Sequence, residues 1–412
     1  MLQSMAAVVP DDPQEIVRQL HTEPARRDPL AFHDRLRELA PVHQDQDSGL
    51  WLLSRWEHCN QVLRSDRFGQ GGRMKQDPRY ARSSSLKLLG DGLTGMDPPE
   101  HTRVRMMAMK GLNRAGVEGM RSYLHQLTDQ ILDELEQEPE FDLVRDYATR
   151  IPSTVICELL GVPREDHARF EAWMQDQFRI LSPLPPSDEV LADTDRSVDA
   201  LEAYLNDIIE QRRRAPKDDL ISAFVATDDA AGQKMTAREA LLLTVVLLGG
   251  GSDTSKSVIA LGTQALLQHP AELRRLIAAP SQDSRAFEEL IRIAGPVIIA
   301  NPRTSWDDIE IGGHHIRAGD LVAAVLISAN YDPAVFQDPH RLDLGRSPNP
   351  HLSFGHGPHI CVGNMLARMV VMHAITALVR RFPDLKLMDD TFEPRLDLFA
   401  LRGVKSLKVR RR

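Results

Sequence analysis

A short segment near the C-terminus combines glycine, histidine and cysteine in an order that could hold a metal ion. It reads Phe354-Gly-His-Gly-Pro-His-Ile-Cys-Val-Gly363, and a helical pattern continues from Gly363 to Arg381. Cys361 is therefore expected just before a helix N-terminus. Unpaired N–H groups and the helix dipole favour a thiolate there, and the thiolate is the form of cysteine that binds metals.

Three interpretations of Cys361 compete at this point. It could be an inert buried cysteine, which behaves as a small hydrophobic residue. It could bind zinc together with His351, His356 or His359, but no CxxC or HxxxH spacing supports such a site. It could also be the single axial thiolate of a haem iron, which needs one cysteine and small residues that admit the porphyrin.

A second candidate lies in the middle of a long predicted helix. Thr236-Ala-Arg-Glu239 forms a capping box, and no stop signal appears before His269-Pro270, about 33 residues or roughly 50 Å later. Gly249–Gly251 interrupt its centre at a cost of about 3 kcal/mol. Glycines here indicate either close helix packing or a flat ligand against the helix. Asp253 and Thr254 beside them could relay protons.

Both segments resemble motifs of the cytochrome P-450 family in its soluble bacterial form. The cysteine segment resembles the family's haem-binding signature. Gly250-Gly-x-Asp-Thr254 resembles its oxygen-activation motif, with Gly250 in place of the usual alanine. Asp97–Arg105 resembles the segment whose histidine and arginine hold haem propionates, and Arg303 lies where another propionate ligand is expected.

Further motifs of the family follow in the same order along the chain. Glu289-Leu-Ile-Arg292 fits its ExxR helix, and Arg341 matches the arginine that completes its salt-bridged triad. Arg402-Gly403 matches its terminal turn, whereas Tyr331 stands where the family commonly has arginine.

The resemblance implies a mainly α fold with a minor β region, in which haem lies between the long central helix and the Cys-loop helix. It implies a single domain over residues 1–412 that binds haem b through Cys361 and uses O₂. The expected reaction inserts one oxygen atom into a C–H or C=C bond of an apolar, fairly bulky small molecule, such as a secondary metabolite, a terpenoid or steroid, or a fatty acyl compound. Oxidative coupling or desaturation without oxygen insertion, a haem-binding sensor and a zinc protein are the alternatives.

The roles that the resemblance implies fall into four groups. Oxygen activation is expected of Thr254 and Asp253. Haem contacts are expected of His101, Arg105, Arg303, His359, Phe354, Gly250 and Gly363. The substrate pocket is expected to include Val246, Gly249, Val297, Ile298, Ile299 and Phe399. A structural ionic network is expected of Glu289, Arg292 and Arg341.

The chain has no GxGxxG fingerprint after a strand, so it shows no flavin or nicotinamide site of its own. Electrons are therefore expected from NAD(P)H through a ferredoxin and a ferredoxin reductase. The expected docking cations are Arg103, Lys110, Arg114 and Arg368. Phe68–Gly92 and Leu181–Asp188 are predicted to be mobile surface loops that gate the pocket.

Composition agrees with a soluble enzyme. Of 412 residues, 42% are hydrophobic and 26% charged, which excludes global disorder. The net charge of −9 argues against nucleic-acid binding. Three separated cysteines make no disulfide framework, so Cys59 and Cys157 are expected to serve only in packing. No apolar run is long enough to span a bilayer, and a cytoplasmic location with no membrane insertion is expected.

Helical periodicity and turn signals predict the elements that must position these residues. Helices are predicted over Val117–Glu136, Ser197–Arg213, Ala286–Ala294 and Gly363–Arg381, besides the central one. Strands are predicted at Trp51–Ser54, in a hairpin over Asp308–Ile316 that turns at Gly312-Gly313, and at Leu321–Ile327.

Overall fold

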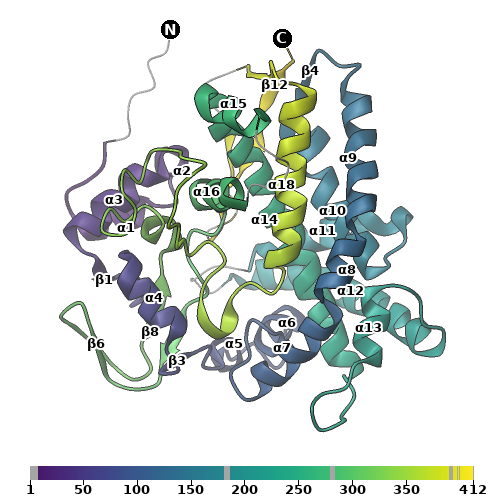
Figure 1. Ribbon diagram of the computed structural model, residues 1–412. Coiled ribbons are helices and arrows are strands. Elements are labelled where there is room, and N and C mark those ends of the chain that lie inside the picture. Colours follow the sequence, from purple (N-terminus) through teal and green to yellow (C-terminus); the bar gives the residue numbers. More distant parts are fainter. Residues whose placement is uncertain are drawn as a thin grey trace.

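One long helix, α14 (Ala237–Gln268), runs through a mainly helical molecule (Figure 1). The structure is a computed structural model that describes residues 8–180, 186–278, 284–388, 393–396, 398 and 400–411.

The first seven helices are α1 (Pro13–Gln19), α2 (Glu23–Arg27), α3 (Pro29–Leu39), α4 (Trp56–Arg64), α5 (Arg73–Gln76), α6 (Ser84–Asp91) and α7 (Glu100–Gly111). Those that precede α14 are α8 (Arg114–Gly119), α9 (Arg121–Leu135), α10 (Arg150–Leu160), α11 (His167–Phe178), α12 (Asp188–Arg214) and α13 (Leu220–Ala226). Those that follow it are α15 (Pro270–Ala278), α16 (Ser284–Ala294), α17 (Leu326–Ala329) and α18 (Asn364–Arg381). A π-helical turn, η1 (Leu143–Ala148), and two 3-10 turns, η2 (Arg164–Asp166) and η3 (Gly357–His359), complete the helical elements.

The predicted capping box is present at the start of α14. The Thr236 hydroxyl accepts a hydrogen bond from the Glu239 N–H at 3.1 Å, and the Glu239 carboxylate accepts one from the Thr236 N–H at 2.8 Å. Behind this start, α14 packs against α10, α12, α16 and α18. The central helix of the sequence prediction is therefore confirmed, and these four helices pack around it.

Strands form a smaller part of the molecule, at the left of Figure 1 and beside the C-terminus. The main sheet has the order β1 (Val42–Gln44), β2 (Trp51–Leu53), β8 (Leu321–Ala324), β5 (Arg303–Ser305), β3 (Phe68–Gly69), and only β2 and β8 pair in parallel. A three-stranded sheet has the order β4 (Glu140–Asp142), β12 (Lys408–Arg410), β9 (Lys386–Leu387). Two hairpins pair β6 (Ile309–Ile311) with β7 (His314–Ile316), and β10 (Glu393–Pro394) with β11 (Val404–Ser406).

The predicted hairpin is confirmed. Gly312 and Gly313 both have positive φ, 57° and 80°, as a two-residue turn between twisted strands requires. The strand predicted over Leu321–Ile327 is only partly correct, because β8 ends at Ala324 and a single helical turn follows. An apolar run of this length does not distinguish a buried strand from a buried helix.

The segment Phe68–Gly92 is not the irregular loop that its composition predicts. It contains β3, α5 and α6, and the Ser83 hydroxyl caps α6 by accepting a hydrogen bond from the Leu86 N–H. Leu86 packs in a buried cluster with Ile180 and Leu191, which anchors the segment. Of the second predicted loop, residues 181–185 lie outside the described part of the chain. No helix of the described residues is long and apolar enough to cross a membrane.

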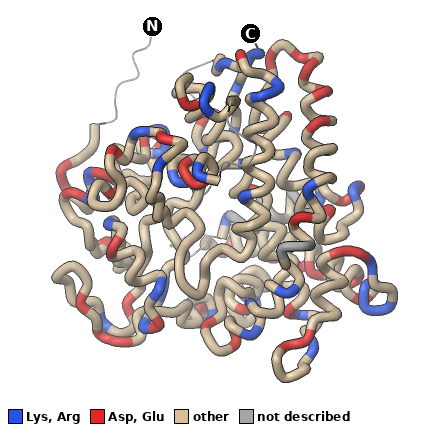
Figure 2. The backbone as a smooth tube through the Cα atoms, in the orientation of Figure 1, with Lys and Arg blue, Asp and Glu red and all other residues tan. Residues whose placement is uncertain are grey.

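Charged residues of both signs are spread along the outer helices and loops (Figure 2), whereas Glu289 on α16 is fully buried. Its carboxylate accepts two hydrogen bonds of 2.8 Å from Arg292 and two of 3.1 Å from Nε of Arg346. The backbone N–H of Asp343 donates a further bond of 3.0 Å. A buried carboxylate is tolerated only when it is paired in this way.

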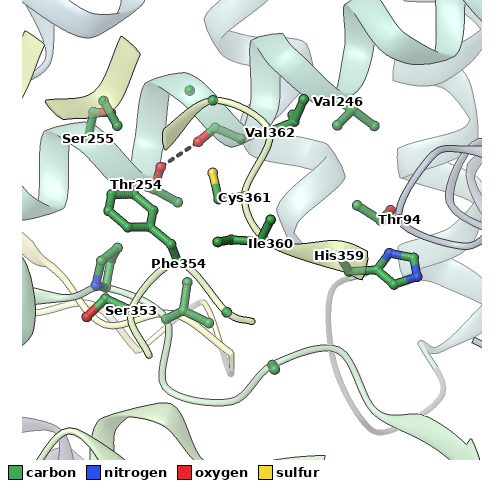
Figure 3. A pocket seen from close by; sticks show the side chains of 18 of the residues that line it. Thr94, Val246, Thr254, Ser255, Ser353, Phe354, His359, Ile360, Cys361 and Val362 are labelled. Carbon is green, nitrogen blue, oxygen red and sulfur yellow. Dashed lines mark hydrogen bonds between the residues drawn. The ribbon is translucent and has the colours of Figure 1, made fainter. Parts of the chain in front are cut away.

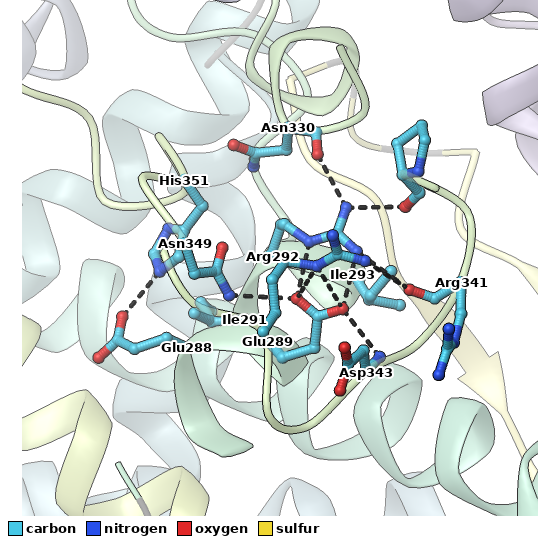
Figure 4. A network of polar contacts seen from close by, with 12 residues as sticks. Glu288, Glu289, Ile291, Arg292, Ile293, Asn330, Arg341, Asp343, Asn349 and His351 are labelled. Carbon is cyan, nitrogen blue, oxygen red and sulfur yellow. Dashed lines mark hydrogen bonds and ion pairs between the residues drawn. The ribbon is translucent and has the colours of Figure 1, made fainter. Parts of the chain in front are cut away.

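The resemblance predicts that Arg341 completes this network, but it does not. Its side chain is exposed, and only its carbonyl oxygen turns towards the Arg292 guanidinium (Figure 4). The second arginine on Glu289 is Arg346, because the chain turns back after Asp343 and brings this later side chain into the core. The network joins α16 to the loop that leads into the cysteine segment.

Replacing Arg346 should therefore destabilise the fold, whereas replacing Arg341 should not. We expect Arg346→Met to lower the free energy of unfolding by about 3–5 kcal/mol, since Glu289 then keeps a buried charge with one fewer partner. Arg341→Met, the matched control, should change it by less than about 0.5 kcal/mol, as exposed substitutions do. Denaturant unfolding of both variants measures the difference, and equal losses would contradict the assignment.

Candidate functional site

The cysteine segment forms a tight loop immediately before α18. Gly355 and Gly357 have φ angles of 69° and 72°, which L side chains rarely adopt. A Cβ at Gly357 would lie 2.3 Å from the Leu63 carbonyl oxygen, so the loop approaches α4 at a distance that only glycine allows. The N–H of Cys361 donates to the carbonyl of Phe354 at 2.8 Å and closes the loop. The loop thus presents one thiol from a fixed backbone.

Cys361 is partly exposed on the wall of a cavity, and Thr254 of α14 lies on the same cavity (Figure 3). Burial raises the pKa of the Cys361 thiol, while the Gly363 N–H and the charges of Arg105 and Arg368 act in the opposite direction. The expected stabilisation by the start of α18 is therefore present, but burial outweighs it. A cation bound at the sulfur would favour the thiolate.

The cavity has a volume of about 390 Å³ and lies between α14 and the cysteine loop. The α14 residues on it are Val246, Leu247, Gly250, Gly251, Thr254, Ser255 and Val258. These positions recur every three to four residues, so they form one face of the helix. Gly249 is not among them, because it points about 140° away from Thr254, which lies near the centre of this face. Its predicted place in the substrate pocket is therefore wrong.

The central glycines of α14 have different surroundings. A Cβ at Gly250 would meet no atom within 4 Å, so this glycine leaves open space on the cavity side. A Cβ at Gly251 would lie 3.4 Å from Ile156 of α10, which is ordinary contact between packed helices. Gly363, at the start of α18, also opens onto the cavity with no neighbour within 4 Å of a Cβ. Close helix packing therefore explains Gly251, whereas Gly250 leaves room for a ligand against the helix.

Four basic or imidazole side chains gather at one part of the cavity wall: His101, Arg105, Arg303 and His359. The His101 and His359 rings lie 4.0 Å apart between centroids. Both ring nitrogens of His101 are buried without a hydrogen-bond partner among the described residues. Arg303 donates to the Val62 and Leu63 carbonyls, and Arg105 donates to the Ile360 carbonyl.

Burial also controls the protonation of this group. It lowers the pKa of His359 to about 3, with further lowering from His101, Arg303 and Arg105, and it lowers the pKa of Arg303 to about 10. Unpartnered, buried donors beside two arginines are expected to bind carboxylates. The cavity therefore combines the Cys361 thiol, a stretch of α14 without a side chain at Gly250, and an edge expected to bind carboxylates. These features fit a flat cofactor with acidic substituents.

Thr254 and Asp253 are adjacent in sequence but point in different directions. The Thr254 hydroxyl lines the cavity and donates to the Gly250 carbonyl at 2.5 Å, the back-bond expected for threonine in a helix. Asp253 is 5% exposed, does not line the cavity, and pairs with Lys256 and Arg395. Two cations therefore hold the Asp253 carboxylate away from the cavity wall.

The remaining wall is mostly apolar. Of the predicted pocket residues, Val246, Val297 and Ile299 line the cavity, whereas Ile298 is packed in the core formed with the N-terminal helices. Phe399 lies outside the described residues. Wall residues absent from the sequence-based pocket include Gln70, Leu93, Thr94, Asn301 and Ala400. They come from loops far apart in the sequence, and no periodic pattern marks them.

The four predicted docking cations have unequal surroundings. Arg103 is bound to Glu239 at the start of α14, so it is a structural residue rather than a free surface charge. Arg368 is half-exposed and pairs with Glu288 at 2.7 Å, while its guanidinium lies 4.6 Å from the centre of the Phe354 ring. Lys110 is exposed. The Arg114 side chain lies outside the described part of the structure.

Sequence comparisons match this chain to known proteins over most of its length. The sequence model of the cytochrome P450 family matches residues 68–279 and 284–408. The polyketide biosynthesis cytochrome P450 PksS of Bacillus subtilis (strain 168) is 32% identical over 94% of this chain and 97% of its own length. The cytochrome P450 monooxygenase PikC of Streptomyces venezuelae is 35% identical over 93% of this chain and 91% of its own length.

Solved structures agree. The crystal structure of P450BioI in complex with an acyl carrier protein that carries hexadec-9Z-enoic acid superposes with a TM-score of 0.87 at 29% identity, over 94% of this chain and 99% of that one. Family match, relatives and fold coincide with a cavity that places one cysteine opposite a glycine-opened helix. On these grounds the chain belongs to the cytochrome P450 family.

Proposed function

We propose that Cys361 is the axial ligand of haem b in this enzyme, and that the cavity between α14 and the cysteine loop holds the porphyrin. Enzymes of this family are oxidoreductases that bind haem through a cysteine thiolate. The observation that carries the proposal is the position of Cys361 on a cavity whose α14 wall lacks a side chain at Gly250.

The surrounding residues have distinct parts in this proposal. His101, Arg105, Arg303 and His359 hold the two haem propionates, which the orphaned nitrogens of His101 support. Gly250 and Gly363 leave room for the ring, and Phe354 packs beside the ligand loop. These contacts come from separated parts of the chain, so we propose that residues 1–412 act as one domain.

When bound, haem supplies the oxidising chemistry that activates O₂, and the protein supplies position and protons. Thr254 presents a hydroxyl to the cavity and can hold a proton donor near the bound substrate. Asp253, one residue earlier, is the nearest acid in sequence and the proposed source of these protons. The apolar wall excludes bulk water from the reacting carbon.

The proposed reaction inserts one atom of O₂ into a C–H or C=C bond of an apolar, fairly bulky molecule. The aliphatic walls formed by Val246, Val297 and Ile299 support such a substrate. Relatives named for polyketide biosynthesis and a neighbour bound to an acylated carrier protein favour a secondary metabolite or a fatty acyl compound over a small polar one. A terpenoid or steroid fits the same walls.

Electrons are proposed to arrive from NAD(P)H through a ferredoxin and its reductase. The cysteine side of the molecule carries the half-exposed Arg368 and two exposed apolar side chains, Ile360 and Met106. An apolar spot beside a cation suits an acidic electron carrier. Lys110 lies further along α7 and can extend this contact.

Cys361→Ser tests the ligand assignment. The reduced, carbon-monoxide-bound protein should lose the absorption band that is typical of thiolate-ligated haem, because a serine hydroxyl does not replace a thiolate on iron. Cys157→Ala, which removes a buried cysteine of α10, should keep the band. Persistence of the band in Cys361→Ser would refute the assignment.

Thr254→Ala tests proton handling. We expect more hydrogen peroxide per NAD(P)H oxidised, by about fivefold or more, because the hydroxyl that holds the proton donor is lost. Thr254→Ser keeps the hydroxyl and should stay near the wild-type ratio. Unchanged peroxide formation in Thr254→Ala would count against this role.

Labelled dioxygen tests the reaction type. With hexadec-9Z-enoic acid as the probe, the oxidised product should carry one labelled oxygen atom when analysed by mass spectrometry. Products that lack the label, from a reaction that still consumes O₂ and NAD(P)H, would favour desaturation or coupling instead.

A further inference from the structure

Asp253 has an arrangement that its proposed role as a proton source does not by itself require. Its Oδ1 atom forms an ion pair with the Lys256 ammonium at 2.5 Å and accepts a hydrogen bond from Nη1 of Arg395 at 2.6 Å. Its Oδ2 atom is buried and has no hydrogen-bond partner among the described residues. One oxygen of the carboxylate thus interacts with two cations, while the other has no hydrogen-bond partner among the described residues.

All members of this cluster are shielded from water. The side chains of Asp253, Lys256 and Arg395 are 7%, 14% and 11% exposed. Charges in such surroundings interact strongly, and removing one partner of a buried pair leaves a charge that the fold tolerates poorly. The position of the Asp253 carboxylate therefore depends on both cations.

The two cations reach Asp253 from different parts of the chain. Lys256 lies three residues further along α14, whereas Arg395 follows β10, 142 residues away. The N–H of Arg395 donates to the Gly403 carbonyl at 3.0 Å, which ties Arg395 to the chain just before β11.

Gly403 allows this approach. A Cβ at Gly403 would lie 2.9 Å from Oγ of Ser257, one turn after Asp253 on α14, and 3.4 Å from Cδ of Arg395. The missing side chain lets the backbone before β11 lie directly against α14. The nearby residues Ala400 and Leu401 line the cavity, so the chain that carries Arg395 also forms part of the pocket wall.

We propose that Arg395 is the positioning residue for Asp253. Together with Lys256 it fixes Oδ1, so that Oδ2 keeps one orientation and can hydrogen-bond a water molecule that carries protons towards the cavity. This inference rests on the proposed function, because Asp253 is useful in this way only if protons are consumed at the cavity. Arg395 itself is not among the described residues that line the cavity.

A matched pair of variants separates this role from a general effect on the C-terminal hairpin. Arg395→Gln removes the cation from Asp253, and Arg395→Lys restores a charge at the same place. Lys405→Gln is the control, because Lys405 pairs with Glu393 on the same hairpin at 2.9 Å, with both side chains half-exposed. Asp253→Asn gives the full loss of the acid.

The first measurement is NAD(P)H oxidation driven by a ferredoxin and its reductase, in H₂O and in D₂O. Asp253→Asn should slow oxidation by about tenfold or more and raise the solvent isotope effect, since proton delivery then limits turnover. Arg395→Gln should change both in the same direction, by about threefold or more in rate. The oxidation rate of Arg395→Lys should be within about twofold of the wild-type rate, and that of Lys405→Gln should equal the wild-type rate.

The second measurement does not depend on turnover. Hydrogen exchange followed by mass spectrometry should show faster exchange in peptides containing Asp253 and in peptides containing Arg395, in both Asp253→Asn and Arg395→Gln. The double variant should add little to either single variant, because both remove the same contact. Lys405→Gln should leave the α14 peptides at the wild-type rate.

The outcomes distinguish this proposal from the proposed function. Arg395 does not position Asp253 if Arg395→Gln oxidises NAD(P)H as fast as Lys405→Gln does. The same conclusion follows if Arg395→Gln leaves exchange in the Asp253 peptides unchanged and Asp253→Asn leaves exchange in the Arg395 peptides unchanged. Wild-type turnover in Asp253→Asn would overturn the proposal as well. The carbon-monoxide spectrum of each variant reports separately on haem ligation. If the wild-type protein lacks the absorption band of thiolate-ligated haem, the proposed function is overturned and, with it, this role of Arg395.

Discussion

The buried carboxylate of Glu289 sets the path of the chain into the site. Because a charge in the core must be fully paired, Arg292 and Arg346 converge on it from α16 and from the loop after Asp343. That loop leads within a few residues to the cysteine segment, whose backbone closes through the bond from Cys361 to Phe354. This ionic network therefore helps to determine where the Cys361 thiol lies.

The cavity separates polar from apolar functions by burial. Most of its wall is apolar, including Val246, Val297 and Ile299, whereas His101, His359 and the two arginines gather at one edge. Burial lowers the pKa of His359 and Arg303, and the nitrogens of His101 have no partner among the described residues. A carboxylate at this edge would favour the protonated forms of these groups and give His101 a hydrogen-bond partner. One cavity can thus hold the acidic edge of a cofactor and an apolar substrate.

α14 meets different neighbours on each of its faces. Gly250 and Thr254 face the cavity, Gly251 packs on α10, and Asp253 is held from the C-terminal side by Arg395. A helix repeats its direction every 3.6 residues, so adjacent residues of one motif serve different neighbours. The acid and the hydroxyl of the motif are neighbours in sequence but have separate hydrogen-bond partners in the fold.

Local signals in the sequence predicted the capping box of α14, the turn at Gly312-Gly313 and the cysteine before α18, because each depends on residues within one turn of the backbone. The resemblance also pointed to His101 and Arg303, which both line the cavity. It assigned Arg341 in place of Arg346 and Gly249 to the pocket, and it did not find Arg395. Those choices depend on where a loop turns back, which face a helix presents and which distant chain lies against it. Only tertiary packing decides them, since a buried charge takes the partner that the folded chain brings within hydrogen-bond reach.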